Sequence, residues 1–333
     1  MKILVTGGTG FIGSHTCVEL INAGHEVVIL DNLYNSKIDV LDKIKAITGI
    51  KPKFYQVDIK DYNELEKVFG ENNFEAVIHF AGYKAVGESV SIPLDYYDNN
   101  VGGSINLYRL MKKYSVDNLV FSSSATVYGD NFEVPFKEEY GYGNTTNPYG
   151  TTKLVNEMII NDNCKANEKA SAVILRYFNP IGAHESGLLG EIPNGIPNNL
   201  LPYVAQVETG IREYLRVFGD DYDTPDGTGV RDYIHVVDLA KAHVLAIEYA
   251  QKHKGAQTIN VGTGNGYSVL DVLHAYEKAC GRKLEYKIME RRPGDIATSY
   301  ADVSKAERLL GFKAKYDIDK MCEDSYRFYQ NNK

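Results

Sequence analysis

Two side chains capable of proton transfer stand four residues apart in the stretch NPYGTTK, residues 147–153. Asn147 can cap a helix and Pro148 is favoured in a first turn, so a helix is predicted to begin here. With about 3.6 residues per turn, that helix carries Tyr149 and Lys153 on one face. A phenol with a pKa of about 10 is a poor base at neutral pH, but a neighbouring ammonium would stabilise the phenolate and lower that pKa. The pair therefore suits removal of a proton from an alcohol whose carbon gives up a hydride.

The rest of this helix has an apolar stripe. The stripe consists of Leu154, Val155, Met158 and Ile159. At about 100° per residue, the stripe points roughly away from Tyr149 and Lys153. We expect the stripe to bury the helix and leave the pair facing a site. The alternative is the start of an ordinary amphipathic helix, and periodicity does not distinguish packing on a sheet from packing on a second subunit.

The elements that must position the pair begin at the N-terminus. Residues 3–5 read as a buried strand, residues 26–30 read as a second strand, and a helix ending near Gly24 lies between them. The turn before the helix carries Gly7, Gly10 and Gly13. Such a turn lets the backbone approach a pyrophosphate and directs a helix N-terminus at its charge, although a glycine turn alone could merely connect two elements. Asp31 follows the second strand, where a carboxylate accepts hydrogen bonds from a ribose and repels a 2′-phosphate, so NAD is predicted rather than NADP.

Strands and helices continue to alternate after Asp31, which indicates a Rossmann-type doubly wound parallel sheet of the α/β class. The further strands are predicted at residues 53–59, 76–82 and 118–129. Ligands of such sheets bind beyond the carboxyl ends of the strands. The residues expected there are Asp58, Ile59, Ala81, Gly82, Lys84 and Asn99. His79 and His235 lie in apolar strand runs and are expected to be core residues.

The composition excludes several classes of function. The chain has 333 residues and a formal net charge of −8, which gives no support to binding of nucleic acid or a membrane surface. No apolar run approaches the roughly 20 residues that span a bilayer. The four cysteines have no metal or redox spacing, so no metal is expected, and reduced thiols in a cytoplasmic protein are the predicted state.

The combination of the glycine turn, Ser124 and Tyr149-x-x-x-Lys153 resembles the extended short-chain dehydrogenase/reductases. More closely, the whole chain resembles the UDP-glucose 4-epimerase family within that group. The stretches that carry this resemblance are VTGGTGFIGSHT, HFAGYKAVGESV, YYDNNV, FSSSATVYG, RYFNPIGAH, GIPNNLLPY, DGTGVRDYIHVVDLA and RRPGD. The resemblance implies reversible interconversion of UDP-glucose and UDP-galactose through a 4-keto sugar, with tightly held NAD and no net redox change.

The resemblance also implies roles for individual residues. Tyr149 takes the proton of the sugar 4-hydroxyl, Lys153 holds the nicotinamide ribose and tunes the tyrosine, and Ser124 contacts the phenol and the sugar. The cofactor-binding residues are expected to be Gly7, Gly10, Phe11, Ile12, Gly13, Asp31, Asn32, Asp58, Ile59, Phe80, Ala81, Gly82, Lys84, Asn99, Ser122, Tyr149, Lys153, Tyr177 and Phe178. The substrate-binding residues are expected to be Ser124, Asn179, Asn199, Leu200, Phe218, Arg231, Tyr233, Arg292, Asp295 and Ser299. Arg231 and Arg292 would hold the diphosphate, for which the planar guanidinium is well suited.

The expected architecture is a NAD-binding domain at residues 1–179 and a smaller α/β domain for the UDP-sugar at 180–333. A segment near 233–262 is expected to return to the first domain, and the resemblance implies a homodimer. The chain departs from the family pattern at two positions. Thr151 replaces a basic residue that is not catalytic. Ser299 stands where galactose-specific members have a bulky tyrosine, which predicts activity on UDP-GlcNAc and UDP-GalNAc as well.

Four other functions share parts of this pattern. A nucleotide-sugar 4,6-dehydratase needs a carboxylate pair just after the fifth strand, where this chain has Ser124-Ala125-Thr126-Val127. Net oxidation or decarboxylation of a UDP-sugar, or action as another epimerase of the same family, uses the same fold. A non-catalytic NAD-binding sensor does not need Ser124, Tyr149 and Lys153 together with residues that bind UDP.

Overall fold

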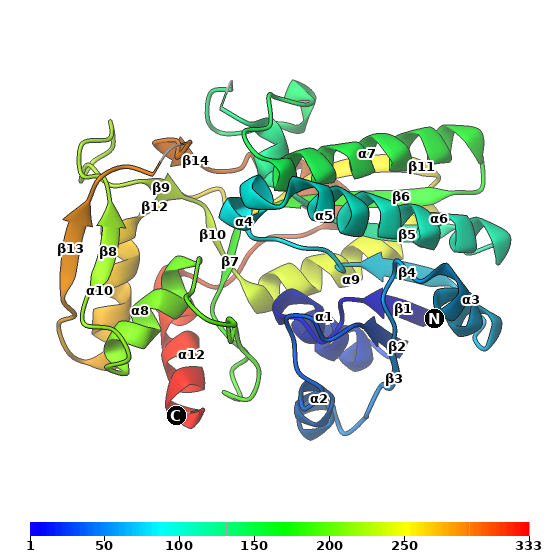
Figure 1. The fold of residues 1–333 in the computed structure, drawn as a ribbon, viewed down its shortest axis with the longest axis horizontal. Coiled ribbons are helices and arrows are strands. Elements are labelled where there is room, and N and C mark those ends of the chain that lie inside the picture. The colour runs from blue at the N-terminus through cyan, green and yellow to red at the C-terminus, as the bar shows by residue number, and fades with distance from the viewer. Residues whose placement is uncertain (131, 293, 333) are drawn as a thin grey trace.

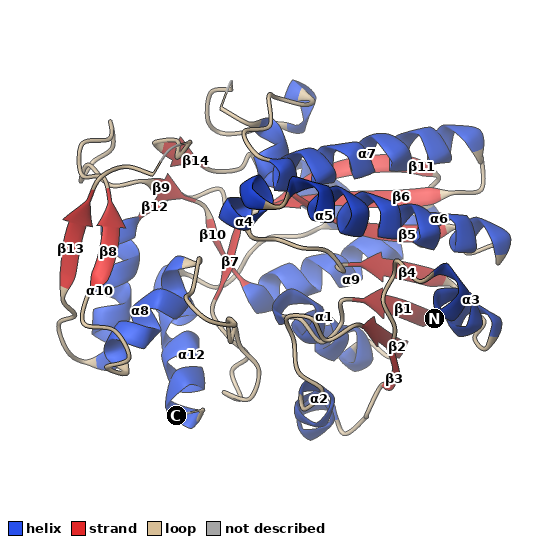
Figure 2. Ribbon diagram, in the orientation of Figure 1, coloured by secondary structure: helices blue, strands red, loops and turns tan. Residues whose placement is uncertain are grey.

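The computed structural model describes residues 1–130, 132–292 and 294–332. Within these residues the centre of the molecule is a seven-stranded sheet whose neighbouring strands all run parallel (Figures 1 and 2). In order across the sheet, the strands are β11 (Gly255–Val261), β6 (Ser171–Tyr177), β5 (Asn118–Ser124), β4 (Ala76–His79), β1 (Lys2–Thr6), β2 (Glu26–Asp31) and β3 (Lys53–Gln56). The predicted doubly wound α/β fold is confirmed.

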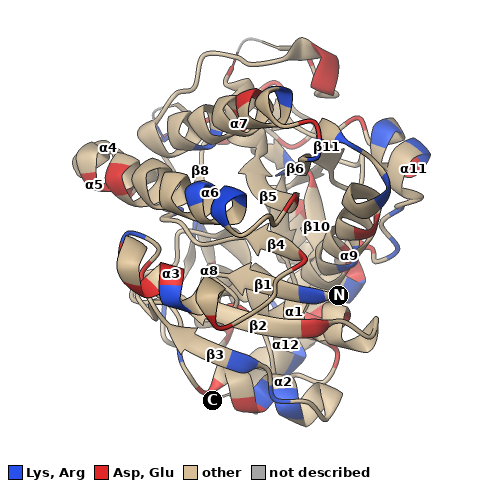
Figure 3. Cartoon of the chain, turned by 90° about the vertical axis from the view of Figure 1, so that its right-hand side faces the viewer, with Lys and Arg blue, Asp and Glu red and all other residues tan. Residues whose placement is uncertain are grey.

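Helices cover both faces of this sheet (Figure 3). One face carries α1 (Phe11–Asn22), α2 (Val40–Thr48), α9 (Val236–Lys252) and α11 (Ser304–Leu310). The other carries α3 (Tyr62–Gly70), α6 (Gly103–Lys113) and α7 (Pro148–Ala166). Alternate side chains of β1 enter the two cores, Ile3 and Val5 on the first face and Leu4 on the second. Because both faces are covered, the strands are continuous apolar runs.

Three strands end earlier than the sequence predicts. The predicted strands 53–59, 76–82 and 118–129 end at Gln56, His79 and Ser124. The third gives way to a 3₁₀ helix, Ala125–Tyr128, because the Ser124 hydroxyl accepts a hydrogen bond from the Thr126 amide at 3.2 Å and starts a turn. The chain segments released at these three points lie at the carboxyl edge of the sheet.

Short helical segments connect β4 to α6, and a smaller lobe follows β6. The connecting segments are α4 (Val86–Ser91), α5 (Pro93–Tyr97) and a π-helical turn (Asp98–Gly102); a 3₁₀ turn (Glu138–Tyr140) precedes α7.

The helices of the smaller lobe are α8 (Leu200–Glu208), α10 (Val269–Cys280) and α12 (Ile318–Asn331). Its strands form three small sheets. In the first, β7 (Asn179–Ile181) pairs with β10 (Tyr233–His235), and in the second, β9 (Val230–Arg231) lies between β12 (Tyr267–Ser268) and β14 (Thr298–Ser299). In the third, β8 (Leu215–Phe218) pairs with β13 (Tyr286–Met289).

The chain crosses between the two lobes more than once (Figure 1). The predicted boundary at residues 179 and 180 falls inside β7, directly after the sheet strand β6. From β10 the chain re-enters the larger lobe, where α9 packs on α1 and β11 pairs along β6 from Gly255 to Val261. It then returns to the smaller lobe at β12. The division into two functional domains stays a prediction.

Helix α7 turns a polar face toward the protein, so the expectation that its apolar stripe buries it was wrong. Lys153, Asn156 and Glu157 are buried, whereas Met158 of the stripe is 45% exposed. Polar groups can be buried here because each has a partner: Asn156 donates to the Asn100 carbonyl at 2.8 Å, and Glu157 accepts from Arg176 at 2.7 Å. Of the stripe, Leu154 and Ile159 are half-buried at the edges of two cores, and only Met158 is exposed.

Both predicted core histidines are buried and hydrogen-bonded. The His79 ring nitrogens lie 2.7 Å from Thr6 Oγ1 and 2.8 Å from Ser104 Oγ. Burial, with a smaller effect of Lys153, lowers the pKa of His79 to about 3, so the ring is neutral. His235 caps α9 by accepting from the Val237 amide at 3.1 Å. Both histidines thus have structural roles.

No helix in the described part of the chain is long and apolar enough to cross a membrane. The same residues contain no group of three or more His, Cys, Asp or Glu that could hold a metal ion. All four cysteines are free thiols.

Candidate active site

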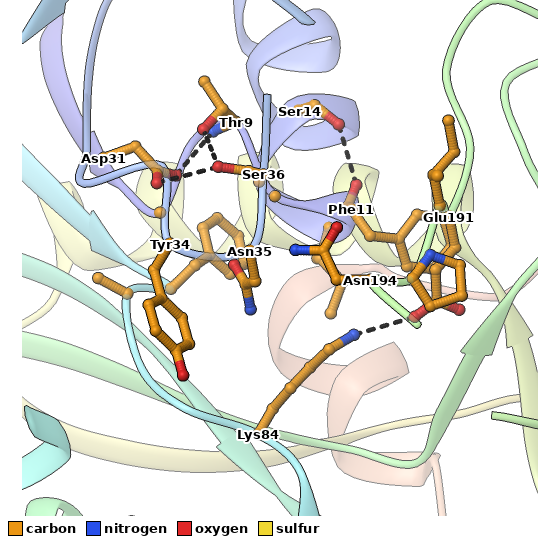
Figure 4. Close-up of a pocket in the computed structure, with 18 of the residues that line it drawn as sticks. Thr9, Phe11, Ser14, Asp31, Tyr34, Asn35, Ser36, Lys84, Glu191 and Asn194 are labelled. Atoms are coloured by element: carbon orange, nitrogen blue, oxygen red, sulfur yellow. Dashed lines mark hydrogen bonds and ion pairs between the residues drawn. The ribbon is translucent and has the colours of Figure 1, made fainter. Parts of the chain in front are cut away.

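A cavity of about 660 Å³ runs along the carboxyl edge of the parallel sheet (Figure 4). One wall comes from the segments that follow β1, β2, β3 and β4 and from the ends of β5 and β6. The opposite wall is a loop of the smaller lobe, residues 188–199, between β7 and α8. The volume and elongated lining suit a ligand larger than a single sugar.

The floor of the cavity at β1 is a bare backbone turn. Gly7 has a φ of +71°, which L side chains rarely adopt. A Cβ at Gly13 would lie 2.2 Å from the Gly7 carbonyl oxygen, so a side chain there would displace the turn. The N-terminus of α1 begins directly above this turn, at Phe11. The cradle therefore accepts a phosphate close to the backbone amides and the positive end of the helix.

Asp31 closes one end of the cradle (Figure 4). Its carboxylate accepts from the Thr9 amide at 3.2 Å, the Leu33 amide at 2.9 Å and the Ser36 hydroxyl at 3.1 Å. These bonds fix the carboxylate at the cavity wall, where a ribose hydroxyl would find an acceptor.

The other end of the cavity holds the tyrosine and lysine of α7. As predicted, Pro148 is the first residue of the helix, and Asn147 caps it by accepting from the Gly150 amide at 2.9 Å. Both Tyr149 and Lys153 line the cavity. The Lys153 ammonium lies 5.8 Å from the centre of the Tyr149 ring and donates to the Ser122 carbonyl at 2.6 Å. The pair thus shares one cavity with the glycine cradle.

The electrostatics of the pair differ from the expectation. Burial raises the pKa of Tyr149 to about 12, and a side-chain hydrogen bond with Ser124 opposes this only in part. Burial lowers the pKa of Lys153 to about 8, and the charge of Glu157 opposes that change. Burial thus outweighs the Ser124 hydrogen bond, because desolvation disfavours the charged phenolate. A positive charge close to the ring would lower this pKa.

Most of the residues predicted to bind a cofactor line this cavity. They are Gly7, Gly10, Phe11, Ile12, Gly13, Asp31, Asn32, Ile59, Phe80, Ala81, Gly82, Lys84, Asn99, Ser122, Tyr149, Lys153 and Tyr177. Asp58 and Phe178 are not part of the lining: Asp58 accepts from the Asn32 amide group at 3.0 Å, behind the wall, and Phe178 packs in a small core beside Phe136. The lining of the cavity therefore does not support a cofactor contact for Asp58 or Phe178, and the cofactor contacts of the other residues stay predictions.

The predicted substrate residues divide into two groups. Asn199 lines the cavity. The remaining residues, which lie outside the lining, are Ser124, Asn179, Leu200, Phe218, Arg231, Tyr233, Arg292, Asp295 and Ser299. Part of this set is nevertheless gathered in the smaller lobe: the Arg292 guanidinium lies 4.5 Å from the centre of the Phe218 ring and donates to Asp295 at 3.1 Å. Arg231 pairs in register with Ser299 between β9 and β14.

Several lining residues were not predicted. They include Thr9, Ser14, Tyr34, Asn35, Ser36, Lys37, Lys43, Glu191 and Asn194. Residues 34–37 could have been found, because they follow directly on Asp31 at the end of a strand. Glu191 could not have been predicted from the sequence, because its contact with Lys84 joins positions 107 residues apart.

Comparison with known proteins agrees with this geometry. Residues 3–262 match the NAD dependent epimerase/dehydratase family. A UDP-glucose 4-epimerase of Bacillus subtilis is 57% identical over 332 residues, covering 100% of this chain and 98% of the relative. The crystal structure of a UDP-glucose 4-epimerase from Bifidobacterium longum, in complex with NAD⁺ and UDP, has a TM-score of 0.97 at 55% identity and covers 100% and 99% of the two chains.

A more distant structure, the UDP-Glc/GlcNAc 4-epimerase of Campylobacter jejuni, has a TM-score of 0.86 at 35% identity and covers 99% of each chain. The resemblance to UDP-glucose 4-epimerases that the sequence motifs predict is thus confirmed over the full length. The chain belongs to the NAD dependent epimerase/dehydratase family.

Proposed function

We propose that this protein interconverts UDP-glucose and UDP-galactose by NAD-dependent epimerisation at C4. The observation that carries the proposal is that Tyr149 and Lys153 face the same cavity as the glycine cradle and Asp31. The Bacillus subtilis and Bifidobacterium longum relatives bear the name of this activity. The geometry thus combines a proton-transfer group with a place for a hydride carrier.

The residues of the cavity fit NAD. Gly7 and Gly13 leave room for a pyrophosphate that any side chain would occupy, and the α1 N-terminus favours its charge. The Asp31 carboxylate suits a ribose with free hydroxyls and disfavours a 2′-phosphate. When bound, NAD⁺ accepts the C4 hydride and returns it, and its positively charged ring favours the phenolate.

The chain's own groups then have defined tasks. Tyr149 removes the proton of the sugar 4-hydroxyl and returns one to the same oxygen after the sugar has presented its other face. Lys153, held on the Ser122 carbonyl, keeps a positive charge near the phenolate, and Ser124 supplies a hydrogen bond that lowers the pKa of the phenol. Tyr177, also in the lining, contributes to the wall on the side of the pair.

We assign the UDP part of the substrate to the smaller lobe, residues 180–333, and the cofactor to residues 1–179 with the return segment 233–262. Arg292 and Arg231 supply local cations for the diphosphate in a chain whose formal net charge is −8. Phe218, already beneath the Arg292 guanidinium, offers a flat apolar face for uracil, and Asp295 an acceptor for the uridine ribose. Asn179, Asn199, Leu200 and Tyr233 complete the predicted nucleotide-sugar contacts.

The test is direct. Purified protein is incubated with UDP-galactose without added NAD, and UDP-glucose is measured. Product in that sample supports epimerisation with retained cofactor, and product only with added NAD supports the same reaction with a weakly held cofactor. No product under either condition contradicts the proposal and favours a non-catalytic NAD-binding protein, while a dehydrated sugar product would point to a dehydratase.

We further propose that the N-acetylated pair, UDP-GlcNAc and UDP-GalNAc, is also a substrate. Ser299 is a small residue on β14, nearly buried beside Arg231, where a larger side chain would reduce the space for the sugar. The Campylobacter jejuni relative is described as acting on both UDP-Glc and UDP-GlcNAc.

Replacing Ser299 by Tyr is expected to lower kcat/KM for UDP-GalNAc at least about tenfold and to leave kcat/KM for UDP-galactose within a few-fold, because the bulky ring excludes the N-acetyl group. Both substrates are assayed with the wild type, Ser299→Tyr and the matched small replacement Ser299→Ala. Unchanged activity on UDP-GalNAc in Ser299→Tyr would contradict the pocket-size argument.

We propose a homodimer formed through the outer apolar surface of α4, α5 and α7. This surface contains Val86, Val90, Leu94, Tyr97 and Met158, and Leu94 is 81% exposed. Helices α4 and α5 both contact α7, so the three helices that carry these side chains are neighbours. Contiguous exposed apolar surface of this kind marks an interface.

Replacing Leu94 by Asp is therefore expected to convert the dimer to a monomer, because a carboxylate would be buried without a partner in the interface. Sedimentation equilibrium measures the change. Ile50→Asp, at an exposed apolar residue outside this surface, is the control and should remain dimeric. A monomeric wild type, or a dimeric Leu94→Asp protein, would argue against the interface.

We also propose that the protein is cytoplasmic. Its four cysteines are free, which suits a reducing compartment. Recovery of the protein in the secreted or membrane fraction of its source cells would contradict this.

A further inference from the structure

The loop that forms the second wall of the cavity is tied to the first wall by one carboxylate. Glu191 Oε1 accepts from the Lys84 ammonium at 3.0 Å and from the Asn199 side-chain amide at 2.7 Å (Figure 4 shows the contact with Lys84). Lys84 follows β4 of the larger lobe, whereas Asn199 is the residue directly before α8 in the smaller lobe. One oxygen atom therefore joins the two halves of the molecule across the cavity.

Glu191 is itself held firmly. Its side chain is only 11% exposed, and its backbone carbonyl accepts from the Tyr329 hydroxyl of α12 at 2.8 Å. Burying a carboxylate costs free energy that only paired donors offset, so both contacts matter for its position. The Lys84 end is 54% exposed, so the ion pair by itself contributes modestly and is screened by salt.

The two donors belong to opposite walls of the same cavity. Lys84 lines it from the segment that follows β4, on the wall that also carries the glycine cradle, and Asn199 lines it from the 188–199 loop of the smaller lobe. We propose that Glu191 is a positioning residue that couples the two walls: its carboxylate holds Lys84 toward the dinucleotide and Asn199 toward the sugar nucleotide at the same time. The inference rests on the proposed function for the identity of the two ligands. It makes Glu191 a residue that affects cofactor retention and substrate binding together, without taking part in the chemistry.

Two variants separate the two contacts. Glu191→Ala removes both, and it is expected to speed NAD release about fivefold and to raise KM for UDP-galactose about fivefold, with kcat within about twofold, in keeping with partly exposed charged hydrogen bonds. Glu191→Gln keeps an oxygen that can accept from Asn199 but loses the charge that holds Lys84. It is expected to release NAD as fast as the alanine variant while KM stays within about twofold of wild type.

The holoenzyme is used throughout, and NAD release is followed from the loss of bound dinucleotide after dilution, a readout that requires no turnover. Glu185→Ala, at an exposed glutamate six positions earlier in the chain, is the matched control and should behave as wild type. The salt dependence of NAD release should be weaker in Glu191→Gln than in wild type, because the screened pair is gone.

Unchanged NAD release in both Glu191 variants, or an unchanged KM in Glu191→Ala, would overturn the coupling role. If Glu191→Ala fails to fold, the Gln variant, which has nearly the same shape, still tests the Lys84 contact. If the wild type does not act on UDP-galactose, the proposed function fails, and the affinity for UDP measured by calorimetry replaces KM. A weaker UDP affinity in Glu191→Ala alone would then still support the coupling, and equal affinities would overturn it.

Discussion

Replacing Tyr149 by Phe is expected to lower kcat for UDP-galactose about 10³-fold, because the variant has no group to take the 4-hydroxyl proton. The phenyl ring keeps the packing at the start of α7, so KM and NAD content should change little. Phenylalanine has no ionisable hydroxyl, so no side chain at this position could then act as the base. Initial rates with UDP-galactose, measured with the NAD content of each preparation, test the expectation.

Tyr142→Phe is the matched control. Tyr142 lies in the segment that precedes α7 and its hydroxyl accepts from Asn161 at 3.4 Å, outside the cavity lining. Its variant should keep the wild-type kcat. If Tyr149→Phe retained more than about one tenth of the wild-type kcat, the assignment of proton transfer to Tyr149 would be wrong.

Replacing Glu157 by Ala is expected to lower the free energy of unfolding by about 3 to 5 kcal/mol. The side chains of Glu157 and Arg176 are 0% and 2% exposed, and they form an ion pair at 2.7 Å between α7 and β6. Burial disfavours the guanidinium charge, but Glu157 more than offsets this and raises the pKa of Arg176. Without Glu157 the guanidinium is buried with no opposite charge beside it. Urea unfolding of the holoenzyme at a fixed NAD concentration measures the loss.

A double variant distinguishes loss of the pair from loss of packing. Glu157→Met with Arg176→Met removes both charges and keeps apolar volume, so it should be less destabilised than Glu157→Ala. A change of less than about 1 kcal/mol in Glu157→Ala would show that the Arg176 charge finds enough support from the Gly141 carbonyl and the Tyr128 ring.

The fold and one half of the site could be predicted because their signals are local. The glycine turn, α1 and Asp31 lie within 31 residues, and the Asn147 cap of α7 depends on a contact three residues away. Each of these features is determined by neighbours along the chain. The same holds for the parallel sheet, whose strands are short apolar runs between turn residues.

The buried face of α7 and the second wall of the cavity could not be predicted, because they depend on distant partners. Asn156 is buried because the Asn100 carbonyl, 56 residues away, accepts its hydrogen bond. A hydrophobic stripe was the wrong guide there, since polar residues with complete hydrogen bonding can face a sheet. The residues of the 188–199 segment indicate a loop, but its position follows from contacts with distant residues, Lys84 and Tyr329.

The path of the chain through the two lobes has a consequence for how the protein is made. The sheet is completed at one edge by β11, which pairs with β6 although 77 residues separate Tyr177 from Gly255. A ribosome that has synthesised only the first 179 residues has not yet made α9, which covers α1, or the final edge strand. The larger lobe therefore cannot close before the smaller lobe has largely emerged, and the two mature together. For the same reason neither lobe can be exchanged with that of another enzyme by a single crossover.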